Sequence, residues 1–188
     1  MKQTAILLLF VAIMSSCNNK LQKGYAKPYT DGLSESTAKK FSDLKRTYDV
    51  TDIQSGAIIN EIKKDSLTWI YFIDPSCKGQ VSDIKKILTL VAQNQEKFRF
   101  YLVFDYPKLT EDNLAFLRKE LHYDGDMYCL TDIDHYQLVK KIKKEYDRYN
   151  KVPVREYYTN YIFREMELKF IGYTYDISEL AITQATKK

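Results

Sequence analysis

The sequence is poor in the residues that metal and nucleotide sites require. It has two histidines, His122 and His135, and neither has a cysteine or another histidine at metal-ligand spacing, which argues against zinc or iron. The acidic residues between 124 and 134 lack the spacing of a calcium loop and suit turns and helix caps. No glycine-rich phosphate loop, nucleotide fingerprint or Ser/His/Asp order occurs. We therefore expect no metal and no other cofactor.

Long hydrophobic runs and charge of one sign are also scarce. After the first 17 residues, no apolar run approaches the roughly 20 residues that a membrane-spanning helix needs. The formal net charge is +4, and the lysines and arginines are interspersed with aspartates and glutamates. Such mixing does not form the concentrated basic patch typical of nucleic-acid binding, so no nucleic-acid partner is expected.

The N-terminus has the pattern of an export signal. Lys2 supplies a positive charge, and residues 5–14 form an unbroken apolar run that is too short to span a bilayer. The run ends in Met14-Ser15-Ser16-Cys17, which resembles the lipobox of bacterial lipoproteins. The alternative is an ordinary cleaved signal followed by a chance cysteine. The resemblance implies a signal peptide over residues 1–16 and a lipid on Cys17.

Lipidation would fix where the protein resides. Two or more acyl chains hold a protein on a membrane, whereas one chain anchors it only marginally. Cys17 is followed by Asn18 rather than aspartate, which in some lineages favours the outer membrane. We expect a protein of the bacterial cell envelope that is lipid-anchored through Cys17, in the outer membrane and facing the periplasm.

The rest of the chain divides into a tether and one domain. Residues 18–40 are polar, contain glycine and proline, and show no sustained apolar period, so residues 17–40 are interpreted as lipid anchor and flexible tether. About 170 residues remain after the signal, and residues 41–188 are enough for one domain with a single core.

Helical and strand patterns alternate through this domain. In order, they predict a helix with Ile53, Ala57, Ile58 and Ile62 on one face, a strand over 67–73, a helix with Ile84, Ile87, Leu88 and Val91, a strand over 98–104, a helix with Leu114, Leu117 and Leu121 capped by Thr110, a strand over 127–130, a helix with Leu138, Ile142, Tyr146 and Tyr149 opened by Asp132 or Asp134, a strand over 160–163, a turn at 164–166, a strand over 168–173, and a helix from about Ile177.

This order predicts an α/β fold. Strands that alternate with helices pair in parallel through right-handed crossovers, and the last two strands are close enough to form an antiparallel hairpin. We expect a central mixed sheet of about five strands with a C-terminal antiparallel hairpin and helices on both faces.

One motif adds a family resemblance. Residues 69–84 (WIYFIDPSCKGQVSDI) resemble the active-site segment of thioredoxin-like proteins, in which a cysteine follows a buried strand and opens the next helix. The helix and strand between Phe104 and Asp132 resemble the insertion of envelope-anchored thiol/disulfide reductases. The resemblance covers about residues 50–188 and implies a thioredoxin-like three-layer sandwich.

Cys77 is the residue to which the resemblance assigns chemistry. A cysteine at a helix N-terminus has its thiolate stabilised by free backbone amides, and the adjacent Lys78 would add to this effect. Gln80 stands where the family has its second cysteine, so Cys77-Lys78-Gly79-Gln80 is a degenerate CxxC. Because glutamine cannot resolve a mixed disulfide, ordinary dithiol catalysis is disfavoured.

Cys129 is the other thiol of the expected domain. If the sheet order follows the family, one strand separates it from Cys77, and the two backbones lie about 10 Å apart, beyond the roughly 7 Å that a disulfide allows. We interpret Cys129 as a core cysteine.

The family's cis-proline is also altered. Pro153 is the only proline in the region, yet the spacing from Phe163 puts Tyr158, just before Thr159, at the expected position. Either the loop is longer, or tyrosine replaces proline and would be trans because a cis bond there costs about 2.5–4 kcal/mol.

Two functions remain open. In the first, Cys77 forms mixed disulfides with an envelope protein or a small thiol, as a monothiol thiol/disulfide oxidoreductase. In the second, the domain is redox-inactive and binds an extended peptide or a partner protein. The partner-binding residues would be Lys78, Gln80, Pro153, Tyr158 and Thr159.

Overall fold

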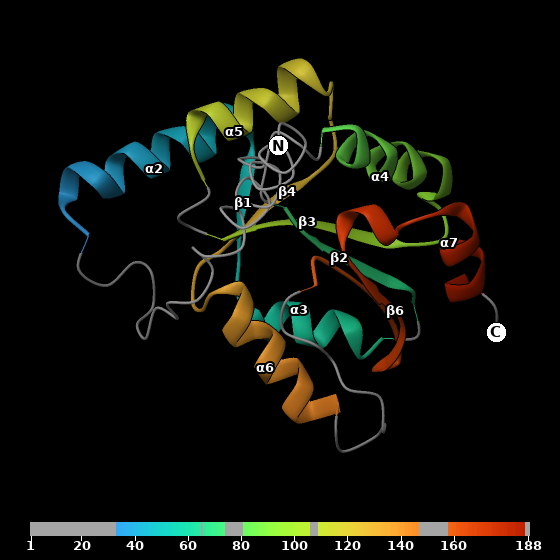
Figure 1. Ribbon diagram of the computed structural model, residues 1–188. Helices are drawn as coiled ribbons and strands as arrows, with labels where there is room; N and C mark the ends of the chain where they lie inside the picture. Colours follow the sequence, from blue (N-terminus) through green and yellow to red (C-terminus); the bar gives the residue numbers. More distant parts are fainter. Residues whose placement is uncertain (1–32, 65, 74–80, 106–108, 147–157, 187–188) are drawn as a thin grey trace, which may run out of the picture.

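The computed structural model describes residues 33–64, 66–73, 81–105, 109–146 and 158–186 (Figure 1). In chain order, the elements are α2 (Glu35–Tyr48), β1 (Val50–Ile53), α3 (Ser55–Ile62), β2 (Thr68–Phe72), α4 (Val81–Asn94), β3 (Arg99–Asp105), α5 (Glu111–Ala115), the π-helix η3 (Phe116–Glu120), β4 (Met127–Leu130), α6 (His135–Tyr146), β5 (Asn160–Arg164), β6 (Glu167–Gly172), the 3-10 helix η4 (Thr174–Asp176) and α7 (Glu179–Thr186).

The strands form one mixed sheet in the order β1-β4-β3-β2-β5-β6. Strands β1, β4, β3 and β2 are parallel to one another, whereas β5 is antiparallel to both β2 and β6. The predicted α/β fold with its C-terminal antiparallel hairpin is therefore confirmed. The expected separation of the strands that precede Cys77 and contain Cys129 also holds, because β3 lies between β2 and β4.

The sheet has six strands rather than about five, and the additional strand is β1, which the sequence pattern did not predict. The sequence pattern had assigned Ile53 to a helical face, but Ile53 ends β1, and α3 begins at Ser55 with Ile58, Ile59 and Ile62 buried. Strand β1 has four residues and pairs with β4, so its main partner lies far along the chain. No local alternation of apolar residues could indicate it.

The first described helix, α2, was not predicted from the sequence. Helix α2 starts at Glu35, inside the stretch for which we predicted no regular structure, so residues 35–40 are helical. The side chain of Ser34 accepts a hydrogen bond from the amide of Thr37 and caps the helix. Leu44 and Tyr48 are its buried side chains, and this sparse apolar face explains why no sustained period was visible.

Two apolar layers enclose the sheet. Figure 1 shows α3 and α6 on one face and α2, α4, α5 and α7 on the other. The central strand β2 is buried along its whole length and alternates between the layers: Trp69 and Tyr71 belong to the α4 side, whereas Ile70 and Phe72 belong to the α3 side. Helices on both faces of a sheet buried in this way match the predicted arrangement.

Trp69 marks the centre of the α4 side. Its side chain is fully buried, and its indole Nε1 donates a hydrogen bond to Asn160 Oδ1 at 3.0 Å. The rings of Phe98 and Phe100 meet the indole edge to face, with centroids 5.6 Å and 5.3 Å away. The polar Nε1 of the buried indole therefore has a hydrogen-bond partner, and its ring has two aromatic neighbours.

The N-terminal caps of α5 and α6 are both formed by residues that were predicted from the sequence. The side chain of Thr110 accepts a hydrogen bond from the amide of Asn113 and caps α5 as predicted. Of the two acids proposed to open α6, Asp134 does so through the amide of Gln137 at 2.6 Å. Asp132 instead lies against the start of α3.

The turn between β5 and β6 uses left-handed backbone without glycine. Glu165 and Met166 have φ angles of 47° and 66°. Their amides donate hydrogen bonds to the carbonyl oxygens of Lys64 and Ile62, at 3.1 Å and 2.8 Å. The turn is thus held by the end of α3, which offsets the cost of the backbone conformation.

Candidate functional site

Several predicted site residues lie outside the described residues. They are Cys17, Cys77, Lys78, Gln80 and Pro153. Tyr158, Thr159 and Cys129 are described. The described part of the chain also contains no helix with the length and apolarity to cross a membrane.

Tyr158 and Thr159 lie at the edge of the sheet where β2 ends. The Thr159 carbonyl accepts a hydrogen bond from the Phe72 amide at 2.8 Å, and the Thr159 amide donates to the Gly172 carbonyl at 3.2 Å. On the other side of β2, the Ile73 amide donates to the Val103 carbonyl at 3.1 Å. The chain therefore leaves the sheet after Ile73 beside Thr159, at the carboxyl edge where ligands of α/β proteins commonly bind.

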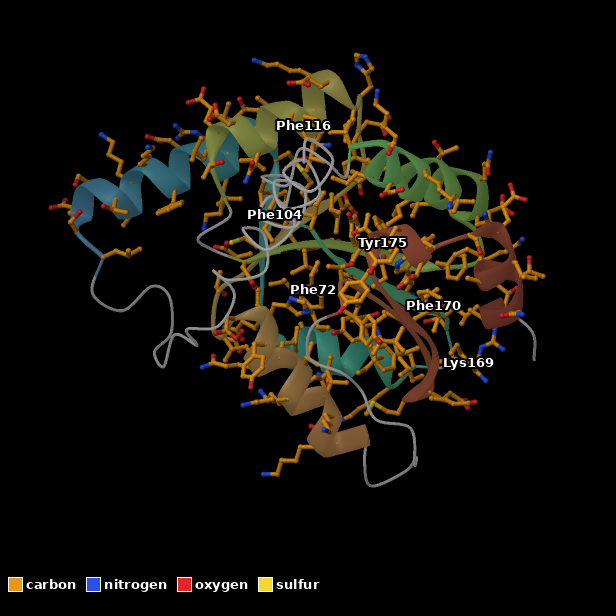
Figure 2. All side chains as sticks on the ribbon, in the orientation of Figure 1. Phe72, Phe104, Phe116, Lys169, Phe170 and Tyr175 are labelled. Carbon is orange, nitrogen blue, oxygen red and sulfur yellow. The ribbon has the colours of Figure 1, made fainter. Side chains whose placement is uncertain are left out.

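A row of three tyrosines lies at this edge. The ring centroids of Tyr158 and Tyr173 are 4.7 Å apart, and those of Tyr173 and Tyr175 are 5.3 Å apart with nearly parallel planes. Tyr173 is 36% exposed and Tyr175 is 58% exposed. In the view of Figure 2, Tyr175 is labelled above Phe72 and Phe170. We call Tyr158, Tyr173 and Tyr175 the tyrosine row.

A polar network underlies the row. The hydroxyl of Thr174 lies 3.2 Å from the hydroxyl of Thr159 and 3.4 Å from that of Tyr71. Asn160 donates to the Thr159 hydroxyl at 3.1 Å. The amide of Tyr173 donates to the carboxylate of Asp176 at 2.7 Å. These bonds connect the loop that carries Tyr173 and Tyr175 to β5, so the row is held in place.

His135 begins α6, in the layer formed by α3 and α6, and packs against the same edge of the sheet. Its ring stacks on Phe72 with centroids 3.8 Å apart and meets Tyr161 edge to face. A hydrogen bond links the ring to the backbone of Tyr158, while Nε2 is buried and has no partner among the described residues. Burial lowers the pKa of His135 to about 3, against the opposing effect of the Tyr158 hydrogen bond. The imidazole is therefore neutral at physiological pH.

Cys129 has the surroundings of a core residue, as predicted. It is fully buried on β4, and its thiol makes only a weak contact with the Leu130 carbonyl at 3.9 Å. Burial first, and then the charge of Asp52, raises its pKa to about 12. Because the thiolate is the nucleophile, such a thiol cannot resolve a disulfide at neutral pH.

Three further residues of this edge, His135, Tyr173 and Tyr175, were not predicted as site residues. His135 was considered only as a metal ligand, Tyr173 ended a predicted strand, and Tyr175 followed that strand. One sequence signal could have indicated the two tyrosines, since Tyr173-Thr174-Tyr175-Asp176 alternates aromatic and polar residues directly after a strand. Their proximity to Tyr158 depends on the hairpin pairing of β5 and β6.

The described residues hold no group of three or more histidine, cysteine, aspartate or glutamate side chains that could bind a metal. Comparison with known proteins gives no match among family models, curated proteins or solved structures. The identity of the chain therefore rests on its residues and topology. It contains an α/β domain with a mixed six-strand sheet.

Proposed function

We propose that the protein is a thioredoxin-like lipoprotein of the bacterial cell envelope that is acylated at Cys17 and uses Cys77 to form mixed disulfides with a partner protein or a small thiol. The observation that carries this proposal is the position of Cys77 in the chain. Residues 74–80 follow the buried central strand β2 in the chain and precede α4, and the end of β2 is bonded to Thr159 through the Phe72 amide. A position between a strand and the next helix suits a nucleophilic cysteine, because the free backbone amides at a helix N-terminus favour the thiolate.

The exchange would proceed in two steps. The Cys77 thiolate attacks one sulfur of a partner disulfide, a new bond forms between them, and the displaced sulfur leaves as a thiolate that takes up a proton. An external thiolate then attacks the partner sulfur of the mixed disulfide, a new disulfide forms between these two sulfurs, and the Cys77 sulfur leaves as a thiolate with the electrons of the broken bond. Gln80 cannot perform the second step, and Cys129 is buried with a raised pKa. The resolving thiol must therefore come from outside the domain.

Alkylation against pH tests this function. In the chain from residue 18 onward, we expect Cys77 to react with an apparent pKa below the roughly 8.5 of a free thiol. Cys129 serves as an internal control, because it should stay unmodified until the protein is denatured. Peptide mapping by mass spectrometry separates the two thiols. A Cys77 pKa at or above that of a free thiol contradicts the proposal, and so does strong insulin reduction by the chain.

A second function is favoured by the tyrosine row. Among the described residues, the exposed large hydrophobic side chains are Tyr173, Tyr175 and Leu180, which come from one short segment. Exposed aromatic residues gathered in one place are typical of partner-binding surfaces. In this case the domain is redox-inactive, and the row binds an extended peptide or partner protein.

Two variants distinguish these functions. Tyr173→Ala with Tyr175→Ala removes the exposed part of the row, and Cys77→Ser removes the thiol. If the domain acts by binding, the tyrosine variant should lose partner cross-linking in cells at least about tenfold, as interface aromatics often contribute 2 kcal/mol or more. The Cys77→Ser variant should then bind like the wild type. Loss of the partner in Cys77→Ser alone supports the thiol function instead. Tyr136→Ala on α6 is the control for a tyrosine outside the row.

A further inference from the structure

A groove on the α4 side of the sheet is separate from the carboxyl edge. It has a volume of about 570 Å³ and lies between α4 and the segment that joins η3 to β4. This size is within the roughly 300–1,000 Å³ of ligand sites. Figure 1 places α4 and α5 on the same face of the sheet. All residues that line the groove are described.

The floor of the groove is apolar. Phe98 and Phe100 line it from the β3 side, and both rings rest against Trp69 below. Leu88 and Val91 of α4 form one wall. These side chains pack on the core, but Leu88, Val91 and Phe100 remain partly exposed. The core is therefore incompletely covered at this place.

The opposite wall consists of Leu121 and Tyr123 and is held by Arg118. The Arg118 guanidinium donates to the carbonyl oxygens of Tyr123 and Gly125, at 2.8 Å and 2.9 Å, and to that of Tyr48 at 3.1 Å. The Tyr123 hydroxyl donates to the Asp126 carbonyl at 3.0 Å. Because these bonds tie the wall to the end of α2, the groove is formed without a ligand.

The rim of the groove is acidic, whereas the whole chain has a positive net charge. The chain carries a formal net charge of +4, yet the groove is lined by Glu120, Asp124 and Asp126 against a single lysine, Lys85. Glu120 and Asp124 are exposed, and neither forms an ion pair with another described residue. The partly exposed apolar floor and the negatively charged rim are together complementary to a ligand in which apolar side chains are flanked by positive charges.

We propose that this groove binds a basic segment of a partner protein, with one or two large apolar side chains on Phe98, Phe100 and Leu121 and with lysine or arginine side chains paired to Glu120 and Asp124. The apolar contacts supply affinity, and the rim charges select a basic segment over an acidic one. This surface does not depend on Cys77 or on the tyrosine row.

The probe for the test is a hexapeptide with blocked ends and the sequence Lys-Leu-Phe-Lys-Leu-Lys. In ¹⁵N NMR titrations of the purified protein, we expect its shift changes to concentrate at α4 and at residues 121–126. The analogue with glutamate in place of lysine should not bind. Shift changes spread over other surfaces, or no binding of the basic peptide, would overturn the proposal.

Charge reversal supplies the matched control. The double variant Glu120→Lys with Asp124→Lys should weaken binding by at least about fivefold, because each exposed pair changes affinity by roughly 1.4- to 5-fold and reversal adds repulsion. The double variant Asp43→Lys with Glu167→Lys has the same net charge, and its positions, the first partly exposed and the second exposed, both lie outside the groove. It should bind like the wild type. Equal weakening by both variants would refute a specific role of the rim. Circular dichroism verifies that both variants are folded.

Discussion

At the scale of single residues, His135 illustrates how burial decides protonation. Its ring lies between two aromatic side chains, Phe72 and Tyr161, and its Nε2 is shielded from solvent. Since the charged form would lose its hydration there, the pKa of His135 falls to about 3. The unfolded chain binds the same proton near the ordinary histidine pKa of about 6.5.

This difference predicts acid sensitivity. Between pH 6.5 and the folded-state pKa of about 3, the unfolded chain carries a proton on His135 that the folded chain does not. The free energy of unfolding should therefore fall with decreasing pH, by at most about 1.4 kcal/mol per pH unit from this residue. In His135→Phe, which keeps an aromatic ring against Phe72, this part of the slope should be lost. Urea denaturation from pH 7 to pH 4 measures both slopes.

His122 provides the control for that measurement. It is exposed and has a left-handed backbone, with φ of 52°, which asparagine tolerates well. Comparison of His122→Asn with His135→Phe separates the loss of an exposed histidine from the loss of the His135 ring. Identical slopes in His135→Phe and wild type would show that the acid response comes from carboxylates instead.

At the scale of elements, α3 depends on a residue far along the chain for its N-terminal cap. Its own N-cap residue, Gln54, makes no side-chain cap bond. The Asp132 carboxylate accepts hydrogen bonds from the Ser55 amide at 2.8 Å and from the Ser55 hydroxyl at 2.5 Å. Lys141 of α6 donates to the same hydroxyl at 3.0 Å. Because Ser55 is fully buried, these groups have no water to replace Asp132.

Removing this cap should destabilise the domain. In Asp132→Ala, the buried amide and hydroxyl of Ser55 lose their acceptor, and we expect the free energy of unfolding to fall by about 1–3 kcal/mol. Asp132→Asn keeps one acceptor oxygen and should lose less. Urea denaturation at pH 7 measures the difference, with Glu167→Ala as the control for an exposed acid. An Asp132→Ala change within about 0.5 kcal/mol of that control would show that the cap contributes little.

The elements differ in how well the sequence predicted them. Strands β2, β3 and β4 were predicted within a residue of their observed ends, because each is a mostly apolar run bounded by polar residues. Strand β1 and helix α2 were missed, because the former depends on pairing with β4 and the latter has few buried side chains. Local pattern predicts an element well when burial is dense along it, and poorly when distant pairing stabilises it.

At the scale of the whole molecule, the order of strands decides which residues can act together. From their spacing to the hairpin, Tyr158 and Thr159 were predicted to be among the partner-binding residues. The sequence could not predict that Tyr173, Tyr175 and His135 join them, because that requires the pairing of β5 with β2 and β6 and the packing of α6. The groove depends likewise on α4, β3 and the segment after η3, which meet only in the folded chain.

The chain has a single tryptophan, and its surroundings give the protein an intrinsic optical reporter. Trp69 is fully buried, so its native emission should lie toward the blue and move to the red on unfolding. The same indole contacts Phe98 and Phe100, whose outer edges face the groove. A ligand seated on those rings would change the quenching of this one fluorophore, so that unfolding and groove occupancy can both be followed by light without attaching a dye.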